Sequence, residues 1–407
     1  MVMPMNNKRM PVISSSLRSA AGRAVSLAAD WAARNQIRDS WPAWDANKGR
    51  FPYHVIIDPV ERARQPQVWS TCWKTARAAQ GLYSAYLVTK DARHLEAANL
   101  AMQYVGTLQV CDPGLELFYG AFREDSPQGP HIQVRDGMEA MQGFVAGYAI
   151  TGDERFLQRA TVGASFLLRT MDRGWFPFGS SRLDGLPAGQ VHHFCFYSGA
   201  LVMAQLFAIT GKREYLTRAV IPWADTLLEK HIRADGALGQ EKSEENSHHV
   251  VNQGPLAGVY INDDGASVAL LGAYAVTRKT KYLDAAVGCA DFWTRVETEL
   301  PALAANPAVA LFLMDVYRLT GDRKYLATIE RYVRLTLSLQ CKSRDSRLRG
   351  CFIGEDMARR YDKRSKPTDY VDLRITAYAL IALSKIAAKD SREWGCSYSC
   401  FGWKPEK

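Results

Sequence analysis

Acidic side chains stand at the start of two apolar segments, where they could take part in acid–base chemistry. Asp136 lies between Arg135 and Glu139 in VRDGMEAM, and Asp263 and Asp264 come directly before GASVALLGAYAVT. Carboxyl groups can act as general acids and bases, and most glycoside hydrolases use a pair of them. Because Asp136 and Asp264 precede a Thr-containing turn by similar distances, we expect them to face each other. A purely structural role, as helix caps or partners of the helix dipole, stays open.

Histidines gather in two other polar stretches. His192 and His193 enter the apolar segment that begins near Tyr197, and His249 lies in the polar stretch EKSEENSHHVV. Imidazole titrates near neutral pH, so such residues can move protons or contact an anionic ligand. We predict His193 as a third catalytic residue, and His192, Tyr197 and His249 as substrate contacts. Helix capping by the histidines is the alternative.

Aromatic and charged residues precede further apolar segments. Trp69, Trp73 and Lys74 stand at the first of them, Trp175 lies in the loop before the histidines, and Asp372 opens the last segment. Indole rings stack on sugar rings, so we predict these residues, together with Arg135, Glu139 and Asp263, as substrate-binding. An aromatic plug made by the tryptophans is an equally open interpretation.

A repeated turn shows which elements position these side chains. The sequence contains TKDARHLEAA, TGDERFLQRA, TGKREYLTRA, TRKTKYLDAA and TGDRKYLATI, five copies of one pattern. The segment before each turn is almost uncharged, which is typical of a helix buried on all sides. The segment after each turn is amphipathic, as expected of a helix with one face in solvent. Each copy therefore predicts a hairpin of one inner and one outer helix.

The two ends of the chain complete the pattern. Ser16–Arg38 has outer-helix character without an inner partner before it, and Asp369–Ala387 has inner-helix character without an outer partner after it. Pairing them predicts an all-α fold, a closed (α/α)6 toroid, whereas an open helical solenoid is the alternative. In a closed ring the starts of the inner helices share one cavity. We expect a disordered lead at 1–15, a single toroid domain at 16–387 and a tail at 388–407.

Composition narrows the class of partner. The net charge of +9 is spread over the chain without a nucleic-acid-binding motif, so an anionic small or oligomeric substrate is expected instead. There is no membrane-spanning apolar run and no apolar signal core, which predicts a cytoplasmic protein. Eight cysteines in 407 residues do not indicate a disulfide framework. No metal or cofactor is expected, and the sequence leaves the oligomeric state open.

A ring of this kind, with acids and aromatic residues at inner-helix starts as in RDGMEAM, resembles the six-hairpin glycosidase superfamily. Within it the sequence is most similar to the unsaturated glucuronyl and rhamnogalacturonyl hydrolases of glycoside hydrolase families 88 and 105. The resemblance implies an aspartate that protonates the double bond of an unsaturated uronate and activates water without a metal. Asp136 is the matching position. Where that family has a further acid on the preceding inner helix, this chain has Ser70, Thr71 and Lys74.

We therefore expect a carbohydrate-active enzyme, a glycoside hydrolase acting on an acidic, uronate-containing oligosaccharide. A sugar epimerase that uses the histidine pairs for proton transfer is one alternative. A uronate polysaccharide lyase with Tyr197 or His193 as base is another. A non-catalytic carbohydrate-binding toroid remains the fourth possibility.

Overall fold

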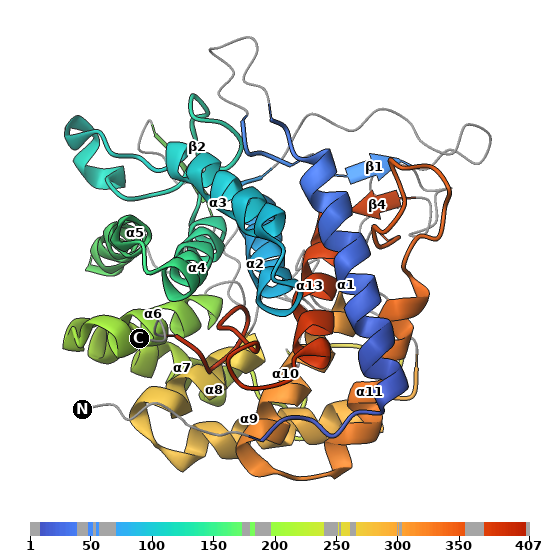
Figure 1. Cartoon of the computed structure of the whole chain (residues 1–407). Coiled ribbons are helices and arrows are strands. Elements are labelled where there is room, and N and C mark those ends of the chain that lie inside the picture. Colours follow the sequence, from blue (N-terminus) through green and yellow to red (C-terminus); the bar gives the residue numbers. More distant parts are fainter. Residues whose placement is uncertain are drawn as a thin grey trace.

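Apolar and amphipathic helices alternate along the chain, as the repeat predicts (Figure 1). The computed structural model describes residues 9–38, 48–51, 54–56, 71–172, 180–183, 197–239, 251, 254–260, 266–298, 300, 303–354 and 370–403. The inner helices are α2 (Cys72–Thr89), α4 (Val134–Thr151), α6 (Tyr197–Thr210), α8 (Ala266–Thr277), α10 (Ala305–Thr320) and α13 (Leu373–Ala387). The outer helices are α1 (Ser15–Asn35), α3 (Ala92–Thr107), α5 (Glu154–Asp172), α7 (Ile221–Lys230), α9 (Thr280–Arg295) and α11 (Lys324–Ser338). A π-helical segment, Tyr215–Val220, leads directly into α7.

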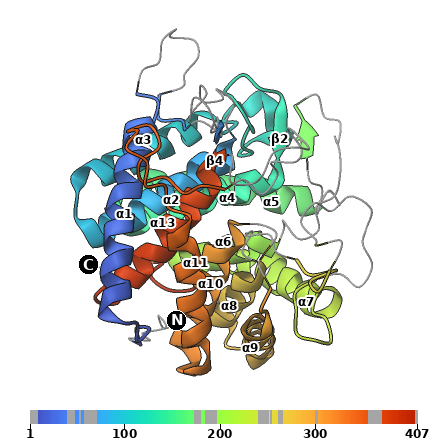
Figure 2. The same ribbon diagram turned by 90° about the vertical axis from the view of Figure 1, so that its right-hand side faces the viewer.

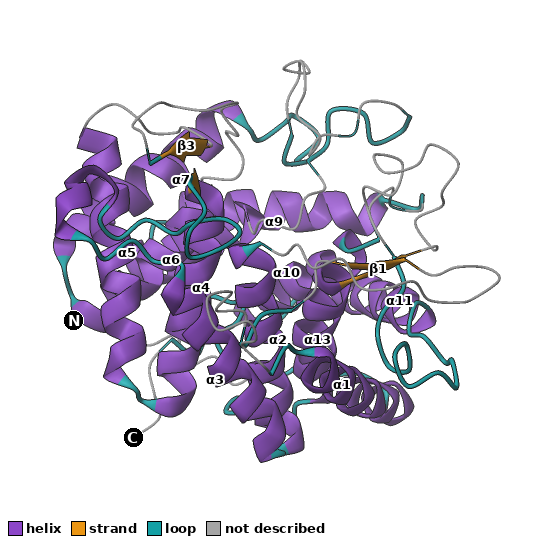
Figure 3. Ribbon diagram, turned by 90° about the horizontal axis from the view of Figure 1, so that it is seen from above, coloured by secondary structure: helices purple, strands orange, loops and turns teal. Residues whose placement is uncertain are grey.

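The helices close into a ring. Each of α3, α5, α9 and α11 packs on the inner helix before it, and α1 packs on α13 (Figure 1, Figure 2). Helix α13 also contacts both α10 and α2, which joins the last inner helix to the first. Seen from above, α2, α4, α10 and α13 lie inside α1, α3, α5, α9 and α11 (Figure 3). The predicted (α/α)6 toroid is confirmed, and the open solenoid is wrong.

Burial explains the two kinds of helix. Every residue of α10 from Ala305 to Arg318 is buried, and α13 is buried along nearly its whole length. By contrast, α1 buries one stripe that includes Ala21, Val25 and Ala28, and its other face meets solvent. A helix enclosed by neighbours on all sides can carry few charges, because an unpaired buried charge is strongly unfavourable.

The threonine of each repeat has one role in all five copies. Its hydroxyl donates to the carbonyl oxygen four residues earlier and accepts the backbone N–H two residues later. One side chain thus links the last turn of the inner helix to the start of the outer helix. The next residue is left-handed, for example Gly152 with φ 70° and Lys90 with φ 58°. Glycine adopts this conformation without steric cost, which accounts for its presence in three of the five turns.

Two short antiparallel strand pairs lie just before inner helices. Strand β1 (His54–Ile56) pairs with β4 (Tyr370–Asp372), and β2 (His131–Gln133) pairs with β3 (Ser180–Arg182). Strand β4 runs directly into α13 and β2 into α4. Both labels appear at the upper end of the ring in Figure 1. The strands therefore fix the starts of α4 and α13 at that end.

The segment after α13 folds back against the inner helices α10 and α13 (Figure 1). Asp315 of α10 accepts hydrogen bonds from the Ser399 hydroxyl at 2.8 Å and from the Cys400 backbone N–H at 2.8 Å. The Lys385 ammonium donates to the Trp394 carbonyl oxygen at 3.0 Å. Trp394 is 1% exposed. Most residues from Trp394 to Trp403 are therefore buried as part of the core.

No helix in the described part of the chain has the length and apolar character needed to cross a lipid bilayer.

Candidate functional site

The first turn of α2 is joined to the start of α13 by a buried ion pair. Lys74 Nζ lies 2.7 Å and 2.8 Å from the two carboxylate oxygens of Asp372. The two side chains are only 1% and 2% exposed. Asp372 also caps α13 by accepting the backbone N–H of Arg374 at 2.7 Å. Because neither charge is solvated by bulk water, each depends on the other for compensation.

Trp73, next to this pair, is surrounded by cations. The Arg135 guanidinium carbon lies 4.6 Å from an indole ring centroid, the Lys74 ammonium 5.5 Å and the Arg374 guanidinium carbon 5.8 Å. These are cation–π distances. Trp73 is 7% exposed, so little of its ring is available for the predicted stacking on a sugar. In this structure the ring instead contacts cationic side chains from the first turns of α2, α4 and α13.

Acidic residues from the segment that leads into α4 lie near the start of α2. Asp136, in the first turn of α4, is 4% exposed and lies 3.6 Å from the Arg135 guanidinium. Burial raises the pKa of the Cys72 thiol well above its ordinary value, and the negative charges of Asp136, Glu124 and Asp125 raise it further. Arg135 therefore places a positive charge beside the Asp136 carboxyl group.

Glu124 is a site residue that the sequence did not predict. The Cys72 backbone N–H donates to the Glu124 carbonyl oxygen at 2.7 Å, which places Glu124 at the start of α2. Burial and the neighbouring charge of Asp125 raise the pKa of Glu124 to about 7, against the opposing effects of a hydrogen bond with Gln133 and the charge of Arg135. Glu124 thus supplies an acid where the sequence of α2 has none. The adjacent acids in FREDSP were the available signal, but spacing alone did not connect that loop to α2.

Glu139 lies deeper in the ring than predicted for a substrate contact. It forms an ion pair with Arg77 of α2, and both side chains are 0% exposed. Arg77 also donates to the side-chain oxygen of Gln80 at 2.9 Å and lies over the rings of Tyr378 and Tyr398 at 5.0 and 5.3 Å. This geometry does not support direct contact between Glu139 and a substrate. The pair joins α2 to α4 beneath the site.

The other predicted site residues fall into two groups. Trp73, Lys74, Arg135, Asp136 and Asp372 gather at the starts of α2, α4 and α13. Outside the described residues lie Asp264, His193, Trp69, Trp175, His192, Asp263 and His249. Tyr197 begins α6, but its side chain is not among those that the structure describes. That Asp136 and Asp264 face each other therefore stays a prediction.

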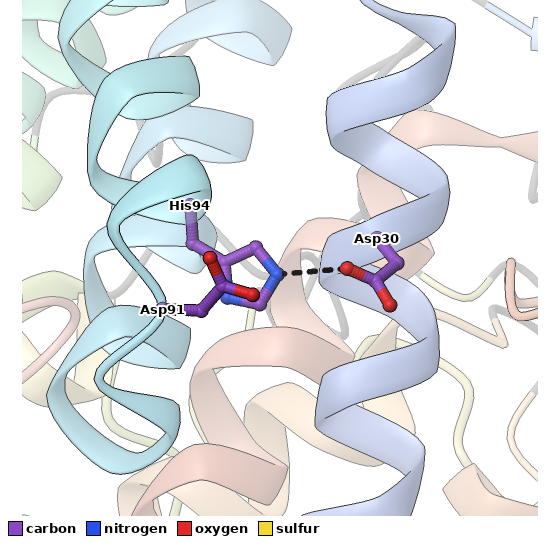
Figure 4. Close-up of side chains that lie close together, drawn as sticks. All are labelled: Asp30, Asp91 and His94. Carbon is purple, nitrogen blue, oxygen red and sulfur yellow. Dashed lines mark hydrogen bonds and ion pairs between the residues drawn. The ribbon is translucent and has the colours of Figure 1, made fainter.

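A second cluster of potential ligands joins α1 to α3. Ligand atoms of Asp30, Asp91 and His94 lie within 4.8 Å of one another. Figure 4 shows Asp30 on α1 facing the other two residues, and the His94 ring nitrogen is 3.2 Å from its carboxylate. The guanidinium of Arg93 lies 3.2 Å from Asp30 and 2.6 Å from Asp91. A cation of the protein therefore already neutralises both carboxylates.

The same clasp recurs between other outer helices. Asp225 of α7 accepts the Tyr282 hydroxyl at 2.7 Å and pairs with Lys281 at 2.6 Å. Asp291 of α9 accepts the Tyr325 hydroxyl at 2.8 Å and pairs with Lys324 at 2.8 Å. Asp30, Arg93 and His94 occupy the equivalent positions in the first copy. The recurrence identifies the cluster as a structural link between neighbouring repeats.

Comparisons with solved structures agree on the fold. An unsaturated glucuronyl hydrolase specific for heparin is 14% identical, with a TM-score of 0.64 over 91% of this chain and 97% of that one. A D-mannose isomerase is 11% identical, with a TM-score of 0.66 over 94% and 99%. The cellobiose 2-epimerase of Bacillus thermoamylovorans is 13% identical, with a TM-score of 0.62 over 90% and 98%. The chain thus has the six-hairpin glycosidase fold. No protein-family model matches the sequence, and no curated protein is similar enough in sequence to count as a match.

Proposed function

We propose that this chain is a carbohydrate-active enzyme that acts on an acidic, uronate-containing oligosaccharide by acid–base catalysis. The observation that carries the proposal is the placement of two acids at the start of α2. The Glu124 carbonyl oxygen accepts the Cys72 backbone N–H at 2.7 Å, and the buried Asp136 lies 3.6 Å from the Arg135 guanidinium. Their environments differ, because Glu124 has a pKa raised to about 7 whereas Asp136 lies beside Arg135. Two carboxyl groups with different environments are the arrangement that divides acid and base roles. The fold shared with sugar-processing enzymes supports a carbohydrate substrate.

Each group has a distinct role in the proposed reaction. Glu124, protonated in a large fraction of molecules at neutral pH, donates the proton to a glycosidic oxygen or to the double bond of an unsaturated uronate. Asp136 accepts a proton from the attacking water. Arg135 and Arg374, both partly exposed around Trp73, bind the uronate carboxylate. Arginine suits this task because its planar fork matches a carboxylate.

A sugar epimerase or isomerase is the second candidate. Similarity to the cellobiose epimerase and the mannose isomerase favours it, since their TM-scores are about equal to that of the glucuronyl hydrolase. The same acid pair could move a proton to and from a sugar carbon. Hydrolysis yields two products from an oligosaccharide, whereas epimerisation and isomerisation yield one product of unchanged mass.

The test is a product screen with unsaturated and saturated uronate oligosaccharides and with neutral aldoses. Hydrolysis of the unsaturated compounds is followed by loss of double-bond absorbance and by new reducing ends. Asp136→Asn and Glu124→Gln are expected to lower kcat by at least about a hundredfold, because general acid–base catalysis contributes this much. The exposed Glu116, in the same loop as Glu124, provides a control variant, Glu116→Gln, with wild-type activity.

The pH profile gives a second readout. The rate should fall as the pH rises through about 7, the pKa of Glu124, because the proton donor is then ionised. Full activity of the Asp136→Asn variant, or conversion of aldoses but no uronate compound, would contradict the proposed function.

A further inference from the structure

Cys341 and Cys351 face each other across two extended segments that follow α11. Gln340 and Phe352 form an antiparallel bridge, and the adjacent Cys341 backbone N–H donates to the Cys351 carbonyl oxygen at 2.8 Å. Opposed residues of an antiparallel pair project their side chains to the same face. The Cys351 thiol donates to the Leu348 carbonyl oxygen at 2.9 Å, and the two thiols influence each other's pKa, as expected of neighbouring sulfur atoms.

We propose that Cys341 and Cys351 are an oxidisable dithiol that closes into an intramolecular disulfide when the protein meets a peroxide. Opposed residues in an antiparallel ladder have Cα atoms about 4.5–5.5 Å apart, within the range that disulfides span. The hydrogen bonds from Cys341 to Cys351 and from Ile353 to Leu339, both 2.8 Å, flank the adjacent Gln340–Phe352 pair. The backbone next to the two cysteines is therefore already held in an antiparallel arrangement that a disulfide can join.

The two thiols differ in a way that assigns their roles. Cys341 is 9% exposed and Cys351 is 0% exposed, so an oxidant reaches Cys341 first. Interaction with the neighbouring Cys351 thiol lowers the pKa of Cys341 to about 6, although burial and Asp345 oppose the effect. The same interaction, together with burial, raises the pKa of Cys351. Cys341 is thus the reactive thiolate, since only the thiolate is a good nucleophile.

The reaction balances with hydrogen peroxide as the oxidant. The Cys341 thiolate attacks one peroxide oxygen, the O–O bond breaks, and Cys341 becomes a sulfenic acid. The hydroxide that leaves takes up the proton that the Cys341 thiol released to solvent and becomes water. The Cys351 sulfur then attacks the Cys341 sulfur, the S–OH bond breaks, and a second water leaves with the Cys351 proton. Two thiols are oxidised to one disulfide, and one peroxide is reduced to two waters. A dithiol reductant reverses the change.

The disulfide would fasten a segment that supports the candidate site. Beyond Cys351, Ile353 and Gly354 both bridge to Val371 of β4, which directly precedes Asp372. The Phe352 backbone N–H also donates to the Thr376 hydroxyl of α13 at 3.1 Å. Oxidation therefore acts on the strand that positions the partner of Lys74. Formation of the disulfide does not depend on the proposed activity.

The experiment treats the folded protein with hydrogen peroxide, blocks remaining thiols with iodoacetamide and maps tryptic peptides by mass spectrometry. Trypsin cleaves within the KSRDSRLRG stretch between the two cysteines, so a disulfide shows as linked peptides. We expect a Cys341–Cys351 cross-link, protection of both residues from alkylation, and recovery of both thiols with dithiothreitol. In Cys351→Ser, Cys341 should accumulate as a sulfenic acid that dimedone traps.

Cys111 provides the matched control, because it is exposed and its sulfur contacts Arg159 at 3.1 Å. Cys111→Ser should leave the Cys341–Cys351 cross-link unchanged. Alkylation of Cys341 at an unaltered rate after peroxide treatment would overturn the proposal. A cross-link that joins other cysteines, or dimedone labelling of Cys341 in the wild-type protein without any cross-link, would overturn it as well.

Discussion

Replacing Glu124 by Gln should make the protein more stable at alkaline pH. Gln has the shape of a protonated Glu but cannot ionise, so it removes the penalty for a buried charge. The pKa of Glu124 rises from 4.5 to about 7. Each pKa unit corresponds to about 1.36 kcal/mol, so the ionised form is disfavoured by on the order of 3 kcal/mol.

The sign follows from linkage. A carboxyl group with a raised pKa in the folded state contributes its full stability below the unfolded-state value of 4.5, and the contribution is lost as the pH rises to about 7. The stability difference between Glu124→Gln and wild type should therefore grow by on the order of 3 kcal/mol from acid to mildly alkaline pH. Urea unfolding at several pH values in this range, followed by circular dichroism, measures it. The same variant should be catalytically impaired.

Glu116→Gln is the control for this measurement, because Glu116 is exposed in the same loop. Its stability difference from wild type should change little with pH. If the stability difference between Glu124→Gln and wild type were equally independent of pH, the assignment of a buried, protonated acid at the start of α2 would be refuted. The proposed proton donor would then lose its physical basis, whatever the activity of the variant.

Two further predictions concern stability. Lys74→Met should destabilise the fold by about 3–5 kcal/mol in urea unfolding, because it leaves Asp372 charged and buried. Adding Asp372→Asn to this variant should recover much of the lost stability. Equal destabilisation by the single and the double variant would contradict the ion-pair argument. Trp394→Ala should cost about 3–5 kcal/mol, the usual effect of deleting a large buried ring. A near-neutral effect in the same assay would show that the segment around Trp394 does not belong to the core.

The repeat could be predicted because it depends on local chemistry. A threonine at a helix end, a left-handed residue such as Gly152 and an apolar or amphipathic run are each visible within a few residues. The closing of the ring also followed from sequence, since Ser16–Arg38 and Asp369–Ala387 have complementary character. None of these inferences needed a distance between remote side chains.

The site was less accessible to sequence reasoning because its contacts are long-range. Lys74 and Asp372 are 298 residues apart, and nothing near either residue indicates the other. Glu124 approaches α2 through a backbone hydrogen bond, which leaves no pattern in the side chains. Glu139 was placed one turn along from Asp136 as expected, but the partner that encloses it, Arg77, comes from a different hairpin.

The pairing of α1 with α13 has a consequence for the order of folding during synthesis. The apolar stripe of α1, which includes Ala21 and Val25, packs on the last inner helix to leave the ribosome. Arg18 of α1 also donates to the Ala388 carbonyl oxygen at 2.5 Å, beyond the end of α13. Helices α2 and α3 also contact α1, but the part of this stripe that packs on α13 must stay uncovered while the intervening hairpins are made. Contacts of such high sequence separation form slowly, so the packing of α1 on α13 is expected to form late.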